Sequence, residues 1–154
     1  IPAITYYFSN QLKSVALSYI RKHLEIKPND EYAILLPAIK AWNGDFSGLE
    51  DDVVNLINRK DMNIRYVLIR LLIHQQESLV YKLFHKKGVG EKLTDEQMPV
   101  YYAMRILMDK NSPVLLKTPP ELQESVDKIL IEIRENQEFY YGKVTDNPKI
   151  NEEG

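Results

Sequence analysis

His74 and Glu77 have residue types and a spacing that could hold a metal ion. Residues three apart lie on the same face of a helix, so an imidazole nitrogen and a carboxylate oxygen could reach one ion there. A protein zinc site needs three or four such ligands, and the chain has no cysteine to complete one. The next histidine, His85, lies about 16 Å away along a continuous helix, too far to bind the same ion. We therefore predict no metal site.

Carboxylates that could act as a general acid and base occur in two clusters, residues 50–52 and 95–96. Each cluster lies in the first turn of a predicted helix, where negative charge offsets the positive end of the helix dipole. The chain also lacks the G-x-S-x-G, P-loop and G-x-G-x-x-G motifs of hydrolases and nucleotide-binding proteins. We predict no cofactor, no catalytic residue and no enzymatic activity.

Charge is distributed unevenly along the sequence. Residues 59–92 carry eight basic and three acidic side chains, a net charge of +5, whereas residues 93–154 carry seven basic and twelve acidic ones, a net charge of −5. The whole chain has a net charge of −2, so its bulk charge indicates neither nucleic acid nor an anionic membrane as a partner. The basic segment supplies the candidate binding residues, which are Arg65, Tyr66, Arg70, Tyr81, Lys82, Lys86 and Lys87.

Two binding functions are open for this basic segment. Its arginines, lysines and tyrosines could line a groove for an acidic or extended segment of another protein, because tyrosine and arginine are enriched at protein interfaces. Basic side chains interleaved with aromatic ones also suit nucleic acid, whose phosphates attract the charges and whose bases stack on the rings. A structural explanation exists as well, since Lys82, Lys86 and Lys87 lie where they would favour the C-terminal end of a helix.

The elements that carry these residues are all predicted to be helices. Apolar residues recur with a helical period, and caps, glycines and prolines separate the periodic segments. Pro37 should kink the second helix, and Ser47 with Glu50 forms the capping-box pattern S-x-x-E at the start of the third. The predicted helices cover about residues 9–26, 31–42, 48–59, 62–84 and 121–142, with a further helix that starts at Thr94 or about one turn later and ends near residue 109.

Two of these helices have apolar patterns that predict the core. The first helix is expected to bury one face, made of Leu12, Val15, Ala16, Tyr19 and Ile20. The fourth helix is apolar almost all round between residues 64 and 73, which is typical of a central buried helix. We expect this helix to continue to about residue 84 and to stop before the glycines at residues 88 and 90.

The stretch LEIKPND at residues 24–30, followed by a helix and then WNGDF at residues 42–46, resembles the tetratricopeptide repeat. In that family a helix ends in an L-E-x-x-P-N turn, and the next helix leads to G-D and an aromatic residue. The positions that fit are Leu24, Glu25, Pro28, Asn29, Asp30, Ala33, Gly44, Asp45 and Phe46, which cover about one repeat. Residues 61–65, with the apolar run after them, also resemble a HEAT repeat. Both families are helical solenoids that bind proteins, so the resemblance implies a binding function without catalysis.

These observations together predict one all-α, helical repeat-like domain over residues 1–142, with about six antiparallel helices stacked as hairpins in a short α-solenoid. A closed helical bundle is the alternative, and the polar, aperiodic residues 143–154 are expected to form a tail. The longest strongly apolar run, residues 66–73, is too short to cross a membrane. We expect a scaffold or adaptor domain of a larger protein that binds a protein or peptide, with nucleic acid as the alternative partner. The composition leaves the compartment open, although the cytoplasm is favoured.

Overall fold

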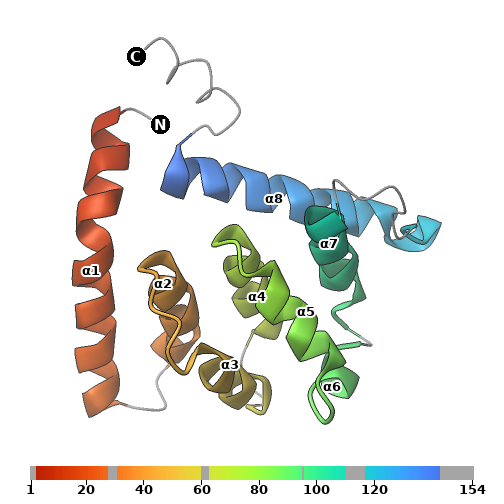
Figure 1. Ribbon diagram of the computed structural model, residues 1–154, viewed down its shortest axis with the longest axis horizontal. Coiled ribbons are helices and arrows are strands. Elements are labelled where there is room, and N and C mark those ends of the chain that lie inside the picture. The colour runs from red at the N-terminus through yellow and green to blue at the C-terminus, as the bar shows by residue number, and fades with distance from the viewer. Residues whose placement is uncertain (1–2, 28–30, 60–62, 95, 110–116, 143–154) are drawn as a thin grey trace.

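The computed structural model describes residues 3–27, 31–59, 63–94, 96–109 and 117–142, and every regular element in these ranges is a helix (Figure 1). The α-helices are α1 (Ala3–Ile26), α2 (Leu36–Trp42), α3 (Leu49–Ile57), α4 (Ile64–Ile73), α5 (Glu77–His85), α6 (Gly90–Thr94), α7 (Met98–Asp109) and α8 (Gln123–Tyr141). Two 3₁₀ helices lead into α2 and α8, and these are η1 (Glu31–Leu35) and η2 (Pro120–Leu122). The all-α prediction is confirmed. None of the helices in these ranges is long and apolar enough to cross a membrane.

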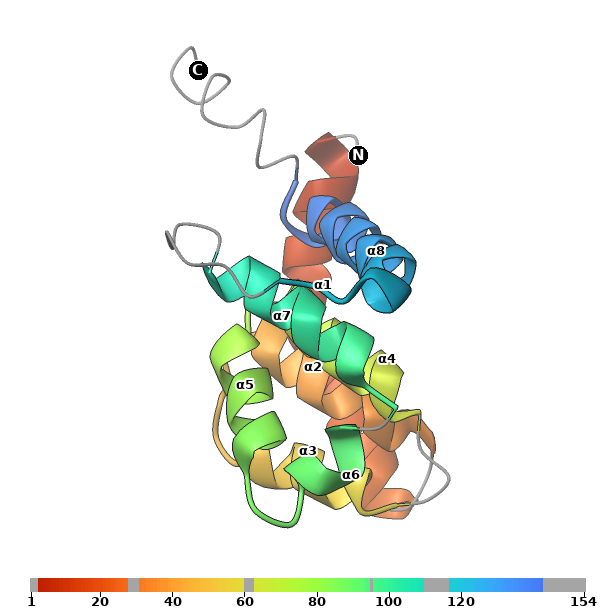
Figure 2. The same cartoon turned by 90° about the vertical axis from the view of Figure 1, so that its right-hand side faces the viewer.

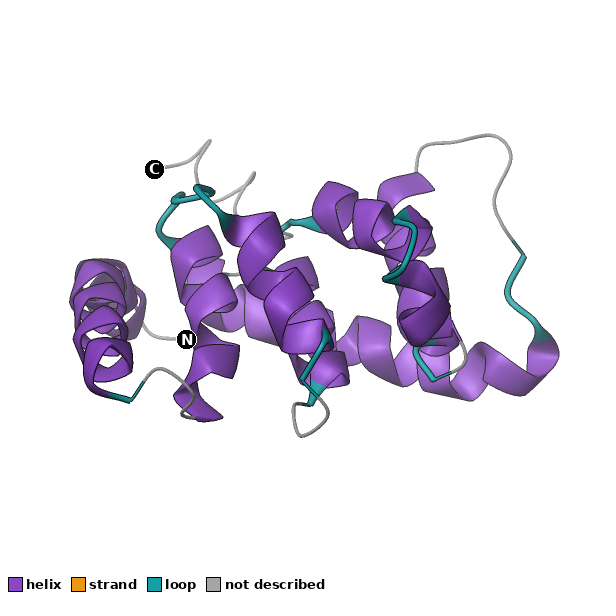
Figure 3. Cartoon of the chain, turned by 90° about the horizontal axis from the view of Figure 1, so that it is seen from below, coloured by secondary structure: helices purple, strands orange, loops and turns teal. Residues whose placement is uncertain are grey.

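The helices pack in sequence order until the last one returns across them. α1 packs on α2, α2 on α3 and α4, α4 on α5, and α5 on both α6 and α7. α8 then contacts α7, α4 and α1, and it runs across the width of the fold (Figure 1, Figure 3). Seen from the side, α8 lies along one edge of the other helices, next to α1 (Figure 2). In an open solenoid each repeat contacts only its neighbours, so the contact between α1 and α8 departs from a simple stack.

α4 lies at the centre of the core, as its nearly continuous apolar sequence predicts. Leu68, Leu71 and Leu72 are each 0% exposed, and buried side chains from α3, α5, α7 and α8 belong to the same cluster. The helix begins after Asn63, whose side-chain Oδ1 accepts a hydrogen bond from the Tyr66 amide at 3.0 Å. This cap satisfies a backbone donor that would otherwise have no partner in the first turn.

The prediction of one helix from residue 62 to 84 is wrong, because this segment forms two helices, α4 and α5, with a short connection between them. Gln75 has a φ of +64°, in the left-handed region, and the Gln76 amide donates to the Leu71 carbonyl at 2.9 Å. This pattern closes the C-terminal end of α4 in the way that a glycine usually does. Neither glycine nor proline stands here, and the break lies in the polar run HQQES at residues 74–78, between the apolar segments of α4 and α5.

Replacing Gln75 with glycine is expected to raise the free energy of unfolding by about 0.5–1 kcal/mol. The left-handed conformation strains a residue with a Cβ, whereas glycine adopts it freely, and this gain exceeds the added entropy of the unfolded chain. Gln76 is the matched control, since its φ of −101° suits any residue and glycine there should lower stability. Urea denaturation measures both changes. Equal losses for the two variants would contradict this explanation of the break.

The buried face predicted for the first helix is wrong in part. Leu17 and Ile20 are buried, at 8% and 6% exposure, but Leu12, Val15 and Tyr19 are 53%, 60% and 66% exposed. Apolar residues occupy two faces of α1, and the face that carries Leu17 and Ile20 is the one turned toward the core. Periodicity shows that a helix has an apolar stripe, but not which of two stripes its neighbours cover.

Three further predictions are wrong. The single kinked helix expected over residues 31–42 does not form: residues 31–35 are the 3₁₀ helix η1, and Pro37 lies in the first turn of α2. The Ser47–Glu50 capping box does not form: the Ser47 hydroxyl donates to Asp45 at 2.6 Å, and no side chain caps α3. The predicted count of about six helices is too low for the described residues, because the break at Gln75 divides one predicted helix and because α6 forms at Gly90–Thr94, where no helix is predicted.

Candidate functional site

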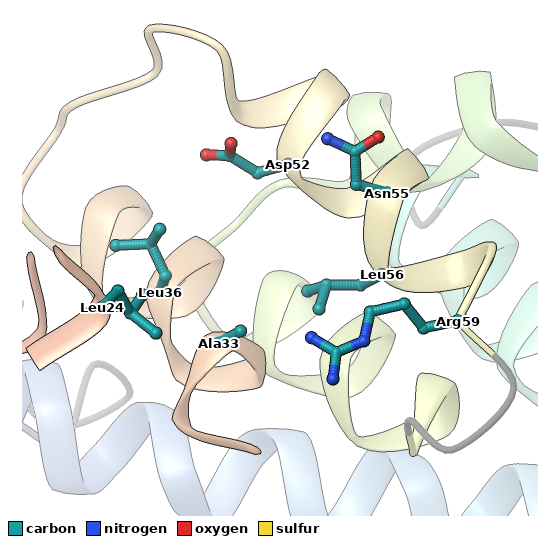
Figure 4. Close-up of a pocket in the computed structure, with 7 residues that line it drawn as sticks. All are labelled: Leu24, Ala33, Leu36, Asp52, Asn55, Leu56 and Arg59. Carbon is teal, nitrogen blue, oxygen red and sulfur yellow. The ribbon is translucent and has the colours of Figure 1, made fainter. Parts of the chain in front are cut away.

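A groove of about 410 Å³ lies where α1, η1, α2 and α3 meet (Figure 4). We call it the α1–α3 groove, and its lining consists of Leu24, Ala33, Leu36, Asp52, Asn55, Leu56 and Arg59. Figure 4 shows Leu24 and Leu36 on one side, and Leu56 and Arg59 on the other. The volume is in the range of pockets that hold a small ligand or a few side chains.

The apolar floor comes largely from the connection between α1 and α2. Leu24 lies near the end of α1, Ala33 lies in η1 and Leu36 is the first residue of α2, and all three are half-buried. Leu24 and Ala33 are among the positions that resemble a tetratricopeptide repeat. The sequence therefore contained a signal for this side of the groove.

The polar rim comes from α3 and the residue that follows it. Asp52 and Asn55 lie on α3, which also carries the core residue Leu56. Arg59 lies two residues after the end of this helix. Asn55 is exposed, and its amide has no hydrogen-bond partner among the described residues. Sequence reasoning missed Asp52, Asn55 and Arg59 as binding residues, because polar side chains in this pattern are typical of any solvent-exposed helix face.

A buried lysine fixes one residue of this rim. The Lys40 side chain is 8% exposed, and its Nζ donates to Asp52 Oδ2 at 2.9 Å and to the Ser47 carbonyl oxygen. A buried ammonium group without acceptors is costly, so Lys40 depends on both contacts. The same contacts hold the start of α3 against α2 and place the Asp52 carboxylate at the groove.

Replacing Asp52 with alanine is expected to lower the free energy of unfolding by about 2 kcal/mol, because Lys40 would stay buried without its counter-charge. The loss should be smaller than for a fully buried pair, since the Asp52 side chain is 32% exposed. In a Lys40→Met background, the same substitution should cost little, because no buried charge remains. Urea denaturation of the four proteins in this cycle measures the coupling. Additive losses would contradict the dependence of Lys40 on Asp52.

One of the candidate binding residues of α4, Arg70, contacts α8. The Arg70 guanidinium donates to Asn136 Oδ1 at 3.0 Å and lies 4.8 Å from the centroid of the Tyr66 ring. Arg65 is exposed on the same helix. Arg70 and Tyr66 therefore contact each other, and Arg70 joins α4 to α8.

The candidate binding residues on α5 and directly after it make separate contacts. Glu50 of α3 forms ion pairs with Lys82 at 2.8 Å and with Lys86 at 2.7 Å. Hydrogen bonds from Lys82 and then Lys86 lower the pKa of Glu50 to about 2, and Glu50 in turn raises the pKa of Lys86. Tyr81 instead stacks on His85, with 4.1 Å between ring centroids, and Lys87 is exposed. The structure therefore does not gather the α4 and α5 candidates into one groove, and their binding role stays a prediction.

The histidine considered as a metal ligand lies in the core. His74 is 5% exposed, and its ring packs against Trp42 of α2 and Tyr140 of α8. Its Nδ1 shares a hydrogen bond with the Tyr141 hydroxyl. In the described ranges, no three side chains of metal-ligating type come together.

The α1–α3 groove combines hydrogen-bond donors and acceptors above an apolar floor. Asn55 supplies both kinds of group, Asp52 adds acceptors and Arg59 adds donors. Such a lining can hold an apolar side chain and the polar main chain next to it. No family model matches the chain, and no curated protein or solved structure shows significant similarity to it.

Proposed function

We propose that this chain is a non-catalytic protein-interaction domain whose α1–α3 groove binds an extended segment of a partner protein. The observation that carries the proposal is the Asn55 amide, which stands without a partner among the described residues beside the leucines of the groove. A groove with this lining favours binding by an apolar side chain and by main-chain hydrogen bonds together.

The bound segment would make two kinds of contact. One apolar side chain would pack on Leu24, Leu36 and Leu56, with a gain of about 25 cal/mol for each Å² of apolar surface removed from water. The Asn55 side chain has one carbonyl acceptor and an NH₂ donor, which is the complement of the N–H and C=O of a peptide group. The Asn55 side chain could therefore both donate a hydrogen bond to the main chain of an extended segment and accept one from it.

The local architecture agrees with the repeat-like interpretation. α1, which carries Leu24, packs on α2 and on η1, which carries Ala33, and α3 packs against α2. We propose that α1 and α2 form a hairpin of tetratricopeptide type within a short solenoid. We also propose that the domain serves as a scaffold or adaptor in a larger protein.

Nucleic acid, the alternative partner, receives less support. Lys82 and Lys86 share the carboxylate of Glu50, and Arg70 is bonded to Asn136. A phosphate backbone would have to compete with these contacts, so fewer of the predicted charges are available to it.

Selection of displayed random peptides on the immobilised chain tests the proposal. We expect selected peptides to share one large apolar residue, and to bind with a dissociation constant that calorimetry can measure. Asn55→Trp should reduce binding at least about tenfold, because the indole would fill the groove and the amide would be lost. Asn55 is exposed, so this substitution should leave the fold intact.

Asn58→Trp is the matched control. Asn58 is also exposed and lies about one turn further along the chain, where its side chain accepts a hydrogen bond from the exposed Lys92, and it does not line the groove. We expect this variant to bind the selected peptides like the original chain. Equal loss of binding in both variants, or no loss in either, would contradict a role for the groove.

A further inference from the structure

A small pocket lies where α5, α6 and α7 meet, on different helices from the α1–α3 groove. Its volume is about 270 Å³, and its lining consists of Phe84, His85, Thr94, Met98 and Tyr101. The volume is just below the range of pockets that hold drug-sized ligands, so it suits one single or fused ring. We call it the α5–α7 pocket.

Most of the lining is aromatic. The Phe84 and Tyr101 rings meet edge to face, with 5.1 Å between their centroids, and the His85 ring lies 5.9 Å from the Tyr101 ring. The His85 ring is itself held in place by stacking on Tyr81, at 4.1 Å between centroids. Met98 adds a polarizable sulfur, which makes favourable contacts with aromatic rings. The pocket therefore favours a flat aromatic ring over an aliphatic group of the same size.

The polar groups that Thr94 and His85 bring to the pocket are both acceptors. The Thr94 hydroxyl donates its only proton to the Gly90 carbonyl oxygen at 2.6 Å, so its oxygen keeps lone pairs that can accept. His85 Nδ1 lies 2.9 Å from the Tyr81 carbonyl oxygen, and a carbonyl can only accept, so Nδ1 carries the proton of this bond. Nε2 of the neutral ring is then an acceptor as well.

The third polar group of the lining, the Tyr101 hydroxyl, is engaged elsewhere. It accepts a hydrogen bond from Arg105 Nη1 at 3.0 Å, and Arg105 does not line the pocket. The Arg105 charge is in turn paired with Asp109 at 3.1 Å. Among the described residues of the lining there is no lysine, arginine or carboxylate, so nothing there would offset the cost of burying a charged ligand.

We propose that the α5–α7 pocket binds an uncharged aromatic ring that carries a hydrogen-bond donor, of which indole is the type. The ring packs against Phe84, Met98 and Tyr101, and its N–H donates to one of the two acceptors at Thr94 and His85. A ring that carries only acceptors gives up its hydrogen bonds to water on entry and gains no donor in return. The pocket therefore selects for the N–H as well as for the shape of the ring.

An NMR titration of the isotope-labelled full chain with indole tests the proposal. We expect a dissociation constant in the millimolar range, with the largest shifts at Thr94, Met98 and Tyr101. Benzofuran is the matched probe, because an oxygen replaces the N–H in a ring of the same shape. It should bind at least about tenfold more weakly, since one hydrogen bond is lost. Equal affinity for the two probes would overturn the proposal, and so would the absence of shifts at the pocket.

Removal of both acceptors isolates the hydrogen bond. The double variant Thr94→Val, His85→Phe keeps a branched side chain and a flat ring at two exposed positions, so its fold should persist, which circular dichroism checks. We expect it to bind indole no more tightly than the original chain binds benzofuran. Thr118→Val makes the threonine change outside the pocket and should leave indole binding unaltered. A double variant that still prefers indole to benzofuran would contradict the assignment of the acceptors.

The ring can belong to a free small molecule or to a tryptophan of a partner protein, and N-acetyltryptophanamide distinguishes these sources. Tighter binding than indole assigns the ring to a tryptophan, because the added peptide groups then make contacts of their own. Equal or weaker binding assigns it to a small molecule. The Asn55→Trp variant, in which the α1–α3 groove is filled, should bind indole like the original chain, because the two sites share no residue. The result is therefore independent of the function proposed for the groove.

Discussion

The Gly90→Ala variant is expected to lose about 3 kcal/mol of its free energy of unfolding. A Cβ at Gly90 would lie 2.0 Å from the carbonyl oxygen of Phe84 and 2.8 Å from its carbonyl carbon. Both are backbone atoms, so no change of rotamer can relieve the overlap, and α6 must move away from α5. That movement would disturb Val89 and Leu93, which are 4% and 2% exposed and belong to the core.

Gly88→Ala separates this steric effect from backbone strain. Gly88 has a φ of +84° and no atom within 4 Å of its Cβ position. Alanine there should cost about 1 kcal/mol, from the left-handed conformation alone. Urea denaturation of the two variants gives the comparison. A loss at Gly90 that does not exceed the loss at Gly88 would contradict the close packing of α6 on α5.

Acidification from neutral pH to about pH 4 is expected to cost about 3 kcal/mol of stability through His74. Burial, and then the nearby Arg70 charge, lower the pKa of His74 from 6.5 to about 4. Between these values the unfolded chain binds a proton that the folded chain does not, so the free energy of unfolding falls as the pH falls. The shift from 6.5 to about 4 corresponds to about 3.5 kcal/mol in full at 1.4 kcal/mol per unit, and about 3 kcal/mol of this is lost by pH 4, where the folded chain is half protonated at His74.

This loss of stability arises because protonation of His74 would place a charge between three helices. The His74 ring lies 6.2 Å from the Trp42 ring and 4.8 Å from the Tyr140 ring, and these side chains belong to α2 and α8. Beside this cluster, Gln137 of α8 donates to the Ile73 carbonyl at 3.2 Å. We therefore expect acid to loosen the attachment of α8 to the end of α4.

A His74→Gln variant isolates this contribution, because carboxylates also titrate near pH 4. The stability of the variant is expected to be lower at neutral pH but to change less between pH 7 and about pH 4. Urea denaturation at several pH values provides both curves. Parallel curves for the two proteins would show that His74 does not carry the pH dependence.

The sequence predicted the helices whose apolar pattern has one interpretation. α4 is apolar almost all round, and α3 has a single apolar stripe at Leu49, Val53, Leu56 and Ile57, all of which are buried. Where a pattern allowed two interpretations, the outcome depended on tertiary packing. α1 has two apolar stripes, and the break at Gln75 lies in a polar run, residues 74–78, that either the exposed face of one helix or a connection between two helices could contain.

The candidate site was predictable on one side only. Leu24 and Ala33 are positions of the sequence pattern that resembles a tetratricopeptide repeat, so part of the floor of the α1–α3 groove carried a sequence signal. Asn55 and Arg59 became candidates only when the packing of α3 on α2 placed them beside that floor. His74 illustrates the same limit, because its spacing from Glu77 suggested a metal ligand, whereas its position between α2 and α8 makes it a core residue.

The most direct test of the proposed function is an NMR titration of the isotope-labelled chain with a selected peptide. We predict the largest chemical-shift changes at the side-chain amide of Asn55 and at the backbone amides of Ala33, Leu36 and Leu56. Residues of α5 and α8 should change little. Changes centred on Lys82, with the Asn55 amide unmoved, would contradict the groove as the binding site and favour the basic segment instead.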